Sequence, residues 1–215
     1  MQPLPLGRSS FSTLRAKNEI YVDKTDWIYQ LTRFDTKALL IRPRRFGKSL
    51  LISTFESLFE NGLKDFHGLA IETLWTDRTY PVVRLDFSGL KTFKSSEQFE
   101  VAFMSFILAS FTKVGFRYEP KKPIVFLDQF KMWLNSLSSS ALVILIDEYD
   151  APLTANLDDK TAFEEIRNLL SDFYAAIKEY EGKIRFFFMT GITKISSTSI
   201  FSAFNNLQDI SMDPL

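Results

Sequence analysis

An unbroken apolar run, residues 141–146, leads directly into the acidic stretch Asp147-Glu148-Tyr149-Asp150. A strand that is apolar on both faces is typical of a parallel sheet covered by helices on its two sides. Three other short apolar segments, at 37–42, 82–87 and 184–189, predict further strands. The alternation of such strands with helical patterns predicts a three-layer α/β fold with a mainly parallel central sheet. The helices are predicted at 26–33, 51–61, 99–107, after Pro123 and at 163–180.

The composition excludes several other classes of protein. A hydrophobic share of 46% is too high for a disordered chain, and we expect most of the 22 Phe residues to pack in the core. Without Cys there is no disulfide, thiol nucleophile or thiolate metal site, and the single His67 excludes a His-rich zinc site. Balanced charge, 26 Lys+Arg against 26 Asp+Glu, argues against a generic basic surface for nucleic acid.

The chain also lacks the features of a membrane or secreted protein. Its longest apolar runs are far shorter than the roughly 20 residues of a membrane-spanning helix, and its N-terminus has no apolar signal-peptide core. We therefore expect a soluble cytoplasmic protein with no membrane partner. Its length predicts a single domain, with 1–36 as an N-terminal segment and 37–215 as the core.

The segment 42–49, RPRRFGKS, lies between a predicted strand and a predicted helix. A P-loop has Gly, four residues, then Gly-Lys-Ser or Gly-Lys-Thr; Gly47, Lys48 and Ser49 match, whereas Arg42 occupies the first Gly position. Backbone N–H groups at such a helix N-terminus bind phosphates, the Lys reaches the β- and γ-phosphates, and the Ser hydroxyl ligates Mg²⁺. The simpler alternative is an ordinary helix start with a surface Lys. The predicted nucleotide-binding residues are Arg44, Arg45, Phe46, Gly47, Lys48, Ser49 and Leu50.

The acids after residue 146 supply the second half of such a site. In P-loop ATPases an acid at this strand end holds Mg²⁺ through its water shell, so the predicted metal residues are Ser49 and Asp147. Glu148 is the predicted general base for the attacking water. Asp150 either supports Lys48 or an Arg, or caps the segment that follows. Together with the loop, these acids predict nucleotide binding.

A further polar position follows the strand at 184–189. Thr190 could sense the γ-phosphate or place the attacking water, which makes it the third predicted catalytic residue beside Glu148 and Lys48; Thr193 is the second choice. A Thr near a turn is equally common without such a role. Residues 193–196 have Ser where a guanine-reading loop needs Asp, which favours ATP over GTP.

The motifs RPRRFGKS and IDEYD (146–150) resemble those of the prokaryotic AAA-ATPase-like family. LPLG at 4–7, YVDKT at 21–25, YPV at 80–82 and segments between 190 and 207 agree with it. The resemblance implies an ASCE/AAA-like P-loop NTPase domain with Lys48, Ser49, Asp147 and Glu148 in the roles given above. It also implies that residues 21–25 lie near the adenine.

Many members of that family continue into a C-terminal nuclease-like domain of the PD-(D/E)XK superfamily. We expect this chain to be an N-terminal fragment or a shortened member that lacks that domain and a helical lid. Nucleic acid would then be a partner through the missing domain, and a homo-oligomer or a protein partner stays open. The sequence identifies no arginine finger; Arg44 and Arg45 are close enough to the phosphates to be considered for that role, and the alternative is that they form salt bridges within the loop or to Asp150.

Three functions fit these motifs. The first is Mg²⁺-dependent binding and hydrolysis of ATP by a switch or motor module, and the second is a nucleotide-binding module with negligible turnover. The third is a nucleic-acid-binding domain that uses the basic loop. The neutral total hides a cationic cluster at 42–48 and an acidic cluster at 147–150, which a parallel sheet brings to the carboxyl ends of nearby strands.

Overall fold

The central sheet is parallel and has five strands in the order β2-β3-β4-β1-β5. The structure is a computed structural model and describes residues 2–33, 37–91, 93, 95–121, 124–195 and 207–212. Because β4 lies between β1 and β3, the ends of these three strands are next to one another along one edge of the sheet. The strands are β1 (Lys37–Ile41), β2 (Val82–Asp86), β3 (Leu142–Asp147), β4 (Ile184–Gly191) and β5 (Leu207–Asp209).

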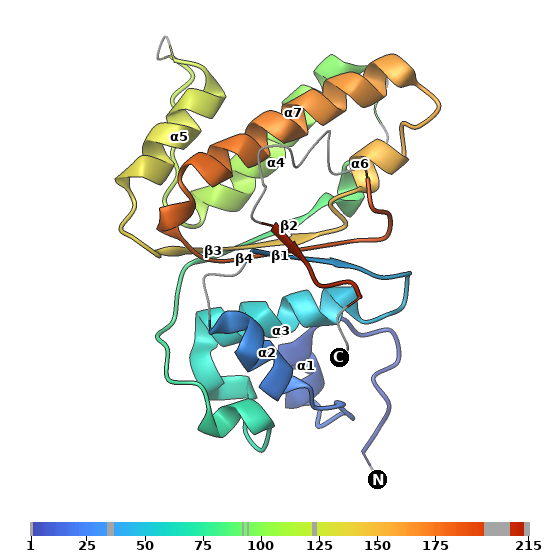
Figure 1. The fold of residues 1–215 in the computed structure, drawn as a ribbon, viewed down its shortest axis with the longest axis vertical. Helices are drawn as coiled ribbons and strands as arrows, with labels where there is room; N and C mark the ends of the chain where they lie inside the picture. Colours follow the sequence, from blue (N-terminus) through green and yellow to red (C-terminus); the bar gives the residue numbers. More distant parts are fainter. Residues whose placement is uncertain are drawn as a thin grey trace.

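Helices cover both faces of this sheet (Figure 1). One face carries α1 (Phe11–Ala16), α2 (Thr25–Thr32) and α3 (Lys48–Asn61). The other carries α4 (Ser96–Thr112), α5 (Phe126–Ser136) and α7 (Lys160–Glu179). The shorter elements are α6 (Ala151–Thr154) and the 3-10 helices η1 (Gly62–Asp65), η2 (Ala70–Thr73), η3 (Phe87–Gly89) and η4 (Glu181–Lys183).

The hydrophobic core is divided into two parts by the sheet. Along β3, Leu142, Ile144 and Ile146 pack with α4, α5 and α7, whereas Val143 and Leu145 pack with α3 on the opposite face. Every residue of β3 is buried. The three-layer α/β fold with a parallel sheet is therefore confirmed, and the two-sided apolar pattern has its expected cause.

Aromatic rings fill both halves of the core, as the Phe content predicts. On the face covered by α4, α5 and α7, contacts join the rings of Phe111, Phe130 and Phe173, with ring centroids 4.8 to 6.5 Å apart. On the face covered by α3, the ring centroids of Phe55 and Phe186 lie 4.9 Å apart. Among the Phe residues that the structure describes, Phe46 is the exception, because it is 66% exposed.

The longer helices and strands agree with the predicted ones at most positions, whereas α1, β5, α6 and the 3-10 helices η1 to η4 were not predicted. The six-residue α1 is held by the Ser10 side chain, which accepts a hydrogen bond from the Thr13 N–H. The three-residue β5 has the sequence Leu-Gln-Asp and adds to the edge of the sheet beside β1. Both α1 and β5 are too short to show a hydrophobic period. No helix within the described ranges is both long enough and apolar enough to cross a membrane.

Candidate functional site

The loop between β1 and α3 is shaped by two left-handed backbone positions. Gly47, the residue before α3, has φ 75°, and Arg45 has φ 68° although it carries a side chain. A non-glycine residue in this region costs about 1–3 kcal/mol, and such positions concentrate at functional sites. Among the described residues no side chain caps the N-terminus of α3, so its first backbone N–H groups are available to an anion.

Lys48 begins α3 and turns back onto the loop. Its Nζ donates to the carbonyl oxygens of Arg42 at 2.9 Å and Pro43 at 3.0 Å. The residue is only 7% exposed, so the alternative of a surface Lys is wrong. In the part of the chain that the structure describes, no carboxylate forms an ion pair with Lys48, and the loop carbonyls alone replace its hydration.

An open pocket of about 710 Å³ lies over this loop and contains residues from three parts of the chain. Its charged side chains are Arg8, Arg44, Arg45, Lys48 and Glu148, so cations predominate. This distribution favours a polyanionic ligand. The complete lining is Gly7, Arg8, Ser9, Arg44, Arg45, Gly47, Lys48, Ser49, Leu50 and Glu148.

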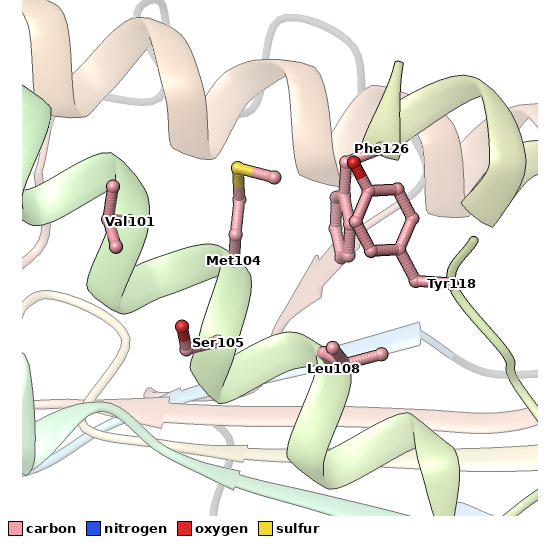
Figure 2. A pocket seen from close by; sticks show the side chains of 6 residues that line it. All are labelled: Val101, Met104, Ser105, Leu108, Tyr118 and Phe126. Carbon is pink, nitrogen blue, oxygen red and sulfur yellow. The ribbon is translucent and has the colours of Figure 1, made fainter. Parts of the chain in front are cut away.

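A second pocket, of about 160 Å³, has a different character (Figure 2). It lies on the outer side of α4, where Tyr118 and Phe126 are in edge contact with ring centroids 5.2 Å apart. Its lining includes Val101, Met104 and Leu108 and carries no charged side chain. The charged pocket over the β1–α3 loop is therefore the better candidate for chemistry.

Asp147 and Thr190 form a buried pair on adjacent strands. The Thr190 hydroxyl donates to Asp147 Oδ1 at 2.6 Å, and the backbone N–H of Glu148 donates to the same oxygen at 3.1 Å. Asp147 is 2% exposed and Thr190 is fully buried. The observed partner of the Thr190 hydroxyl is thus the carboxylate of Asp147, and neither residue belongs to the pocket lining.

Glu148 lines the pocket but is already paired. Its backbone is left-handed, with φ 51°, and its Oε2 accepts a hydrogen bond from Lys91 Nζ at 2.9 Å. Lys91 follows η3, next to β2, and β2 and β1 lie on opposite sides of β3. The ion pair therefore ties the Glu148 carboxylate to the segment that follows β2. Lys91 was not predicted, because no motif links it to Glu148.

Asp150 has neither of the two roles left open by the sequence. Its carboxylate accepts backbone hydrogen bonds from Ile192 at 3.2 Å and Thr193 at 2.8 Å, and it does not cap α6. The neighbouring Tyr149 hydroxyl donates to the Thr193 carbonyl at 3.0 Å. Burial raises the pKa of Tyr149 far above its ordinary value, so this phenol stays a donor. The chain after β4 is tied in this way to the chain after β3.

The exposed cations of the loop have no anionic partner in the part of the chain that the structure describes. Arg44 and Arg45 are exposed, and within the described residues neither forms a salt bridge in the loop or to Asp150. That predicted alternative is therefore not found. Phe46 is absent from the pocket lining, whereas Gly7, Arg8 and Ser9 of the N-terminal segment line the pocket without having been predicted.

Residues 21–25, which the family resemblance associates with adenine, contact a different part of the fold. Asp23 accepts a hydrogen bond from the Ala70 N–H at 2.8 Å, and the Thr25 hydroxyl accepts one from the Ile71 N–H at 3.0 Å. These contacts attach the segment to η2. The position of an adenine stays a prediction.

The donor set at this edge of the sheet fits a magnesium ion bound largely through water. Among the described residues there is no group of three or more His, Cys, Asp or Glu side chains that could enclose a metal. Asp147 Oδ2 accepts no hydrogen bond from the described residues, so one oxygen of this carboxylate is available to a water bound to the metal. Mg²⁺ commonly uses only one or two protein oxygens and keeps several waters.

Comparison with known proteins adds the family. A family model described as predicted AAA-ATPase (AAA-ATPase-like) matches residues 5–201. A protein of Azotobacter chroococcum mcd 1, described as an uncharacterized protein in the vnfD 5′ region, is 32% identical over 212 residues, which are 98% of this chain and 41% of that one. The chain therefore spans about two fifths of that relative's length. A chain in the structure of the Drosophila ORC bound to DNA is similar with a TM-score of 0.45 and 11% identity, over 94% of this chain and 88% of that one.

Proposed function

The chain belongs to the AAA-ATPase-like family, and we propose on that premise that its P-loop module binds ATP with Mg²⁺ and hydrolyses it. One observation supports this proposal above all. The uncapped N-terminus of α3, the Lys48 and Ser49 side chains and the Glu148 carboxylate meet at one pocket. A polyphosphate needs the first three groups, and an attacking water needs the last.

The phosphates are proposed to bind at the first turn of α3. Backbone N–H groups of 47–50 donate to the phosphate oxygens, and the helix dipole adds to their attraction. Lys48 Nζ exchanges its two carbonyl acceptors, on Arg42 and Pro43, for the β- and γ-phosphates. Because phosphate oxygens carry charge and carbonyl oxygens do not, this exchange strengthens both hydrogen bonds.

Ser49 and Asp147 are proposed to hold the magnesium ion, with Asp147 acting through bound water. A bound Mg²⁺ supplies neutralisation of the charge on the β- and γ-phosphates. Thr190 is a positioning residue in this proposal, because its hydroxyl fixes the Asp147 carboxylate at 2.6 Å. The predicted direct contact between Thr190 and the γ-phosphate agrees less well with the complete burial of this residue.

Glu148 is proposed to accept the proton of the water that attacks the γ-phosphate. To do so it has to leave Lys91 or share that ion pair, because Oε2 is occupied at 2.9 Å. The same contact favours a second candidate function, a nucleotide-binding module with negligible turnover. The two candidates differ only in whether Glu148 reaches the water.

The test is to measure ATP affinity and turnover for the wild type, Lys48→Ala and Glu148→Gln at fixed Mg²⁺. Loss of two hydrogen bonds from a charged donor, at about 1.5–3 kcal/mol each, raises the Kd of Lys48→Ala by roughly 10²- to 10⁴-fold. Glu148→Gln keeps the affinity and lowers kcat by about 10²- to 10⁴-fold. Lys131→Ala is the control for the loss of a lysine, because it removes an ion pair with Glu179 that has the same 2.9 Å length as the Lys91–Glu148 pair but lies outside the pocket.

Equal ATP affinity in wild type and Lys48→Ala contradicts the P-loop site. ATP binding without turnover, unchanged in Glu148→Gln, identifies the non-hydrolysing module. Circular dichroism of each variant checks that the fold is retained.

A further inference from the structure

Arg8 reaches the charged pocket from the N-terminal segment, outside the motifs at 42–49 and 146–150. It follows Gly7, whose φ is 69°, and lines the pocket together with Lys48 and Ser49. The segment is fixed to the helix that begins with Lys48, because the Phe11 N–H donates to Ser53 Oγ of α3 at 2.9 Å. A cation is thus placed over the same pocket by a part of the chain about forty residues away from the P-loop.

A buried carboxylate orients the Arg8 side chain. Its Nε donates to Glu19 Oε1 at 2.7 Å and Oε2 at 2.8 Å. The side chain of Glu19 is only 5% exposed, whereas that of Arg8 is 36% exposed. Because the guanidinium is planar and rigid, this contact through one nitrogen fixes the plane of the whole group.

The two terminal nitrogens of Arg8 have no acceptor among the described residues. They carry four of the five N–H donors of the guanidinium, in the fork geometry that matches a phosphate. Arg15, in the same segment, gives the contrast: its donors are used by the carbonyl oxygens of Asp65 and His67. Arg8 therefore has donors available in a pocket whose only acid among the described residues, Glu148, is paired with Lys91.

We propose that Arg8 is a further phosphate-binding residue, which donates through its terminal nitrogens to a phosphate of the nucleotide and is held in place by Glu19. The inference rests on the proposed function and adds the N-terminal segment to the binding site. Glu19 is a positioning residue in this arrangement, because it contacts Arg8 and does not line the pocket.

The experiment is competition by ATP, inorganic triphosphate and adenosine against a fluorescent ATP analogue, at fixed Mg²⁺ and salt. Arg8→Gln is expected to raise the Kd of ATP and of triphosphate by about tenfold, which corresponds to one charge-assisted hydrogen-bonded contact. The Kd of adenosine is expected to stay within about twofold of the wild-type value, because adenosine has no phosphate for Arg8 to contact. Arg15→Gln, which loosens the same segment without touching the pocket, is expected to leave all three values unchanged.

Arg8→Gln leaves Glu19 buried without its partner and could destabilise the chain, so Arg8→Lys is measured beside it. Lys keeps the charge next to Glu19 but lacks the fork, and we expect it to fold and to weaken triphosphate binding by a factor between those of wild type and Arg8→Gln. An equal loss for adenosine and triphosphate, or the same loss in Arg15→Gln, overturns the proposal in favour of a structural role.

Failure of this inference is distinguishable from failure of the proposed function. If Lys48→Ala abolishes ATP binding while both Arg8 variants bind triphosphate as the wild type does, the P-loop site stands and the role of Arg8 is refuted. If Lys48→Ala binds ATP as the wild type does, the proposed function is refuted, and the role of Arg8 with it.

Discussion

Gly191, the last residue of β4, is in contact with the chain after β3, and its replacement by Ala tests how tightly the two are packed. A Cβ built on Gly191 would lie 2.4 Å from Tyr149 Cε1, 2.7 Å from Tyr149 Cδ1 and 2.9 Å from Asp150 Oδ1. Its φ is not in the left-handed region, so the expected effect of Gly191→Ala is steric alone.

The magnitude follows from how little the Tyr149 ring can move. Ordinary contact begins at 3.4 Å, so the ring has to shift by about 1 Å (3.4 minus 2.4). Tyr149 is completely buried, and its hydroxyl is held by the Thr193 carbonyl at 3.0 Å. Overpacking of a core typically costs about 1–3 kcal/mol, and we expect the upper half of that range here. For a chain of this size, 2–3 kcal/mol lowers Tm by about 4–12 °C.

Thermal unfolding followed by circular dichroism measures this change. Gly182→Ala is the matched control, because a Cβ there has no atom within 4 Å and the backbone is not left-handed. We expect its Tm to stay within about 2 °C of the wild type. A Gly191→Ala variant that melts with the Gly182→Ala control would show that β4 and the chain after β3 are not packed as described.

Three further changes test other contacts. Thr190→Val removes the hydrogen bond to the buried Asp147 carboxylate and should lower the free energy of unfolding, measured by chemical denaturation, by about 1.5–3 kcal/mol. Thr190→Ser keeps the donor and should lower it less. Equal losses in the two variants contradict a role for the hydroxyl. Burial acts to raise the pKa of Asp77, but hydrogen bonds from Tyr80, the Arg78 N–H and Arg185 outweigh it and lower the pKa below the ordinary 3.8. The contribution of the Asp77 carboxylate to stability is therefore complete above about pH 5 and is lost as the pH falls through the folded pKa. The stability difference between wild type and Asp77→Asn should shrink on acidification. A constant difference from pH 7 to pH 2 refutes this. If Glu148 is the base, Lys91→Ala should raise kcat about two- to fivefold with unchanged ATP affinity, because a part-exposed ion pair contributes at most about 1 kcal/mol. Lys91→Arg keeps the positive charge and should leave kcat unchanged. A lower kcat in Lys91→Ala shows instead that Lys91 orients the base.

The parts of the fold that could be predicted are those set by neighbouring residues. The two-sided apolar run before Asp147 requires burial on both faces, and this requirement leads directly to a parallel sheet between helix layers. The loop before α3 was also predictable, because the Gly at the start of a helix and the Lys after it lie in one short motif. The elements α1 and β5 were not, since neither is long enough to show a period.

The contacts that complete the candidate site join residues far apart in the chain, and only the tertiary structure decides them. The strand order puts β4 between β1 and β3, which brings the Thr190 hydroxyl to Asp147 across 43 positions of sequence. Lys91 meets Glu148 across 57 positions. The sequence by itself determined which groups stand at the ends of β1, β3 and β4. The packing of the whole sheet decided which of those groups touch, because a hydrogen bond depends on the relative positions of strands that no local pattern encodes.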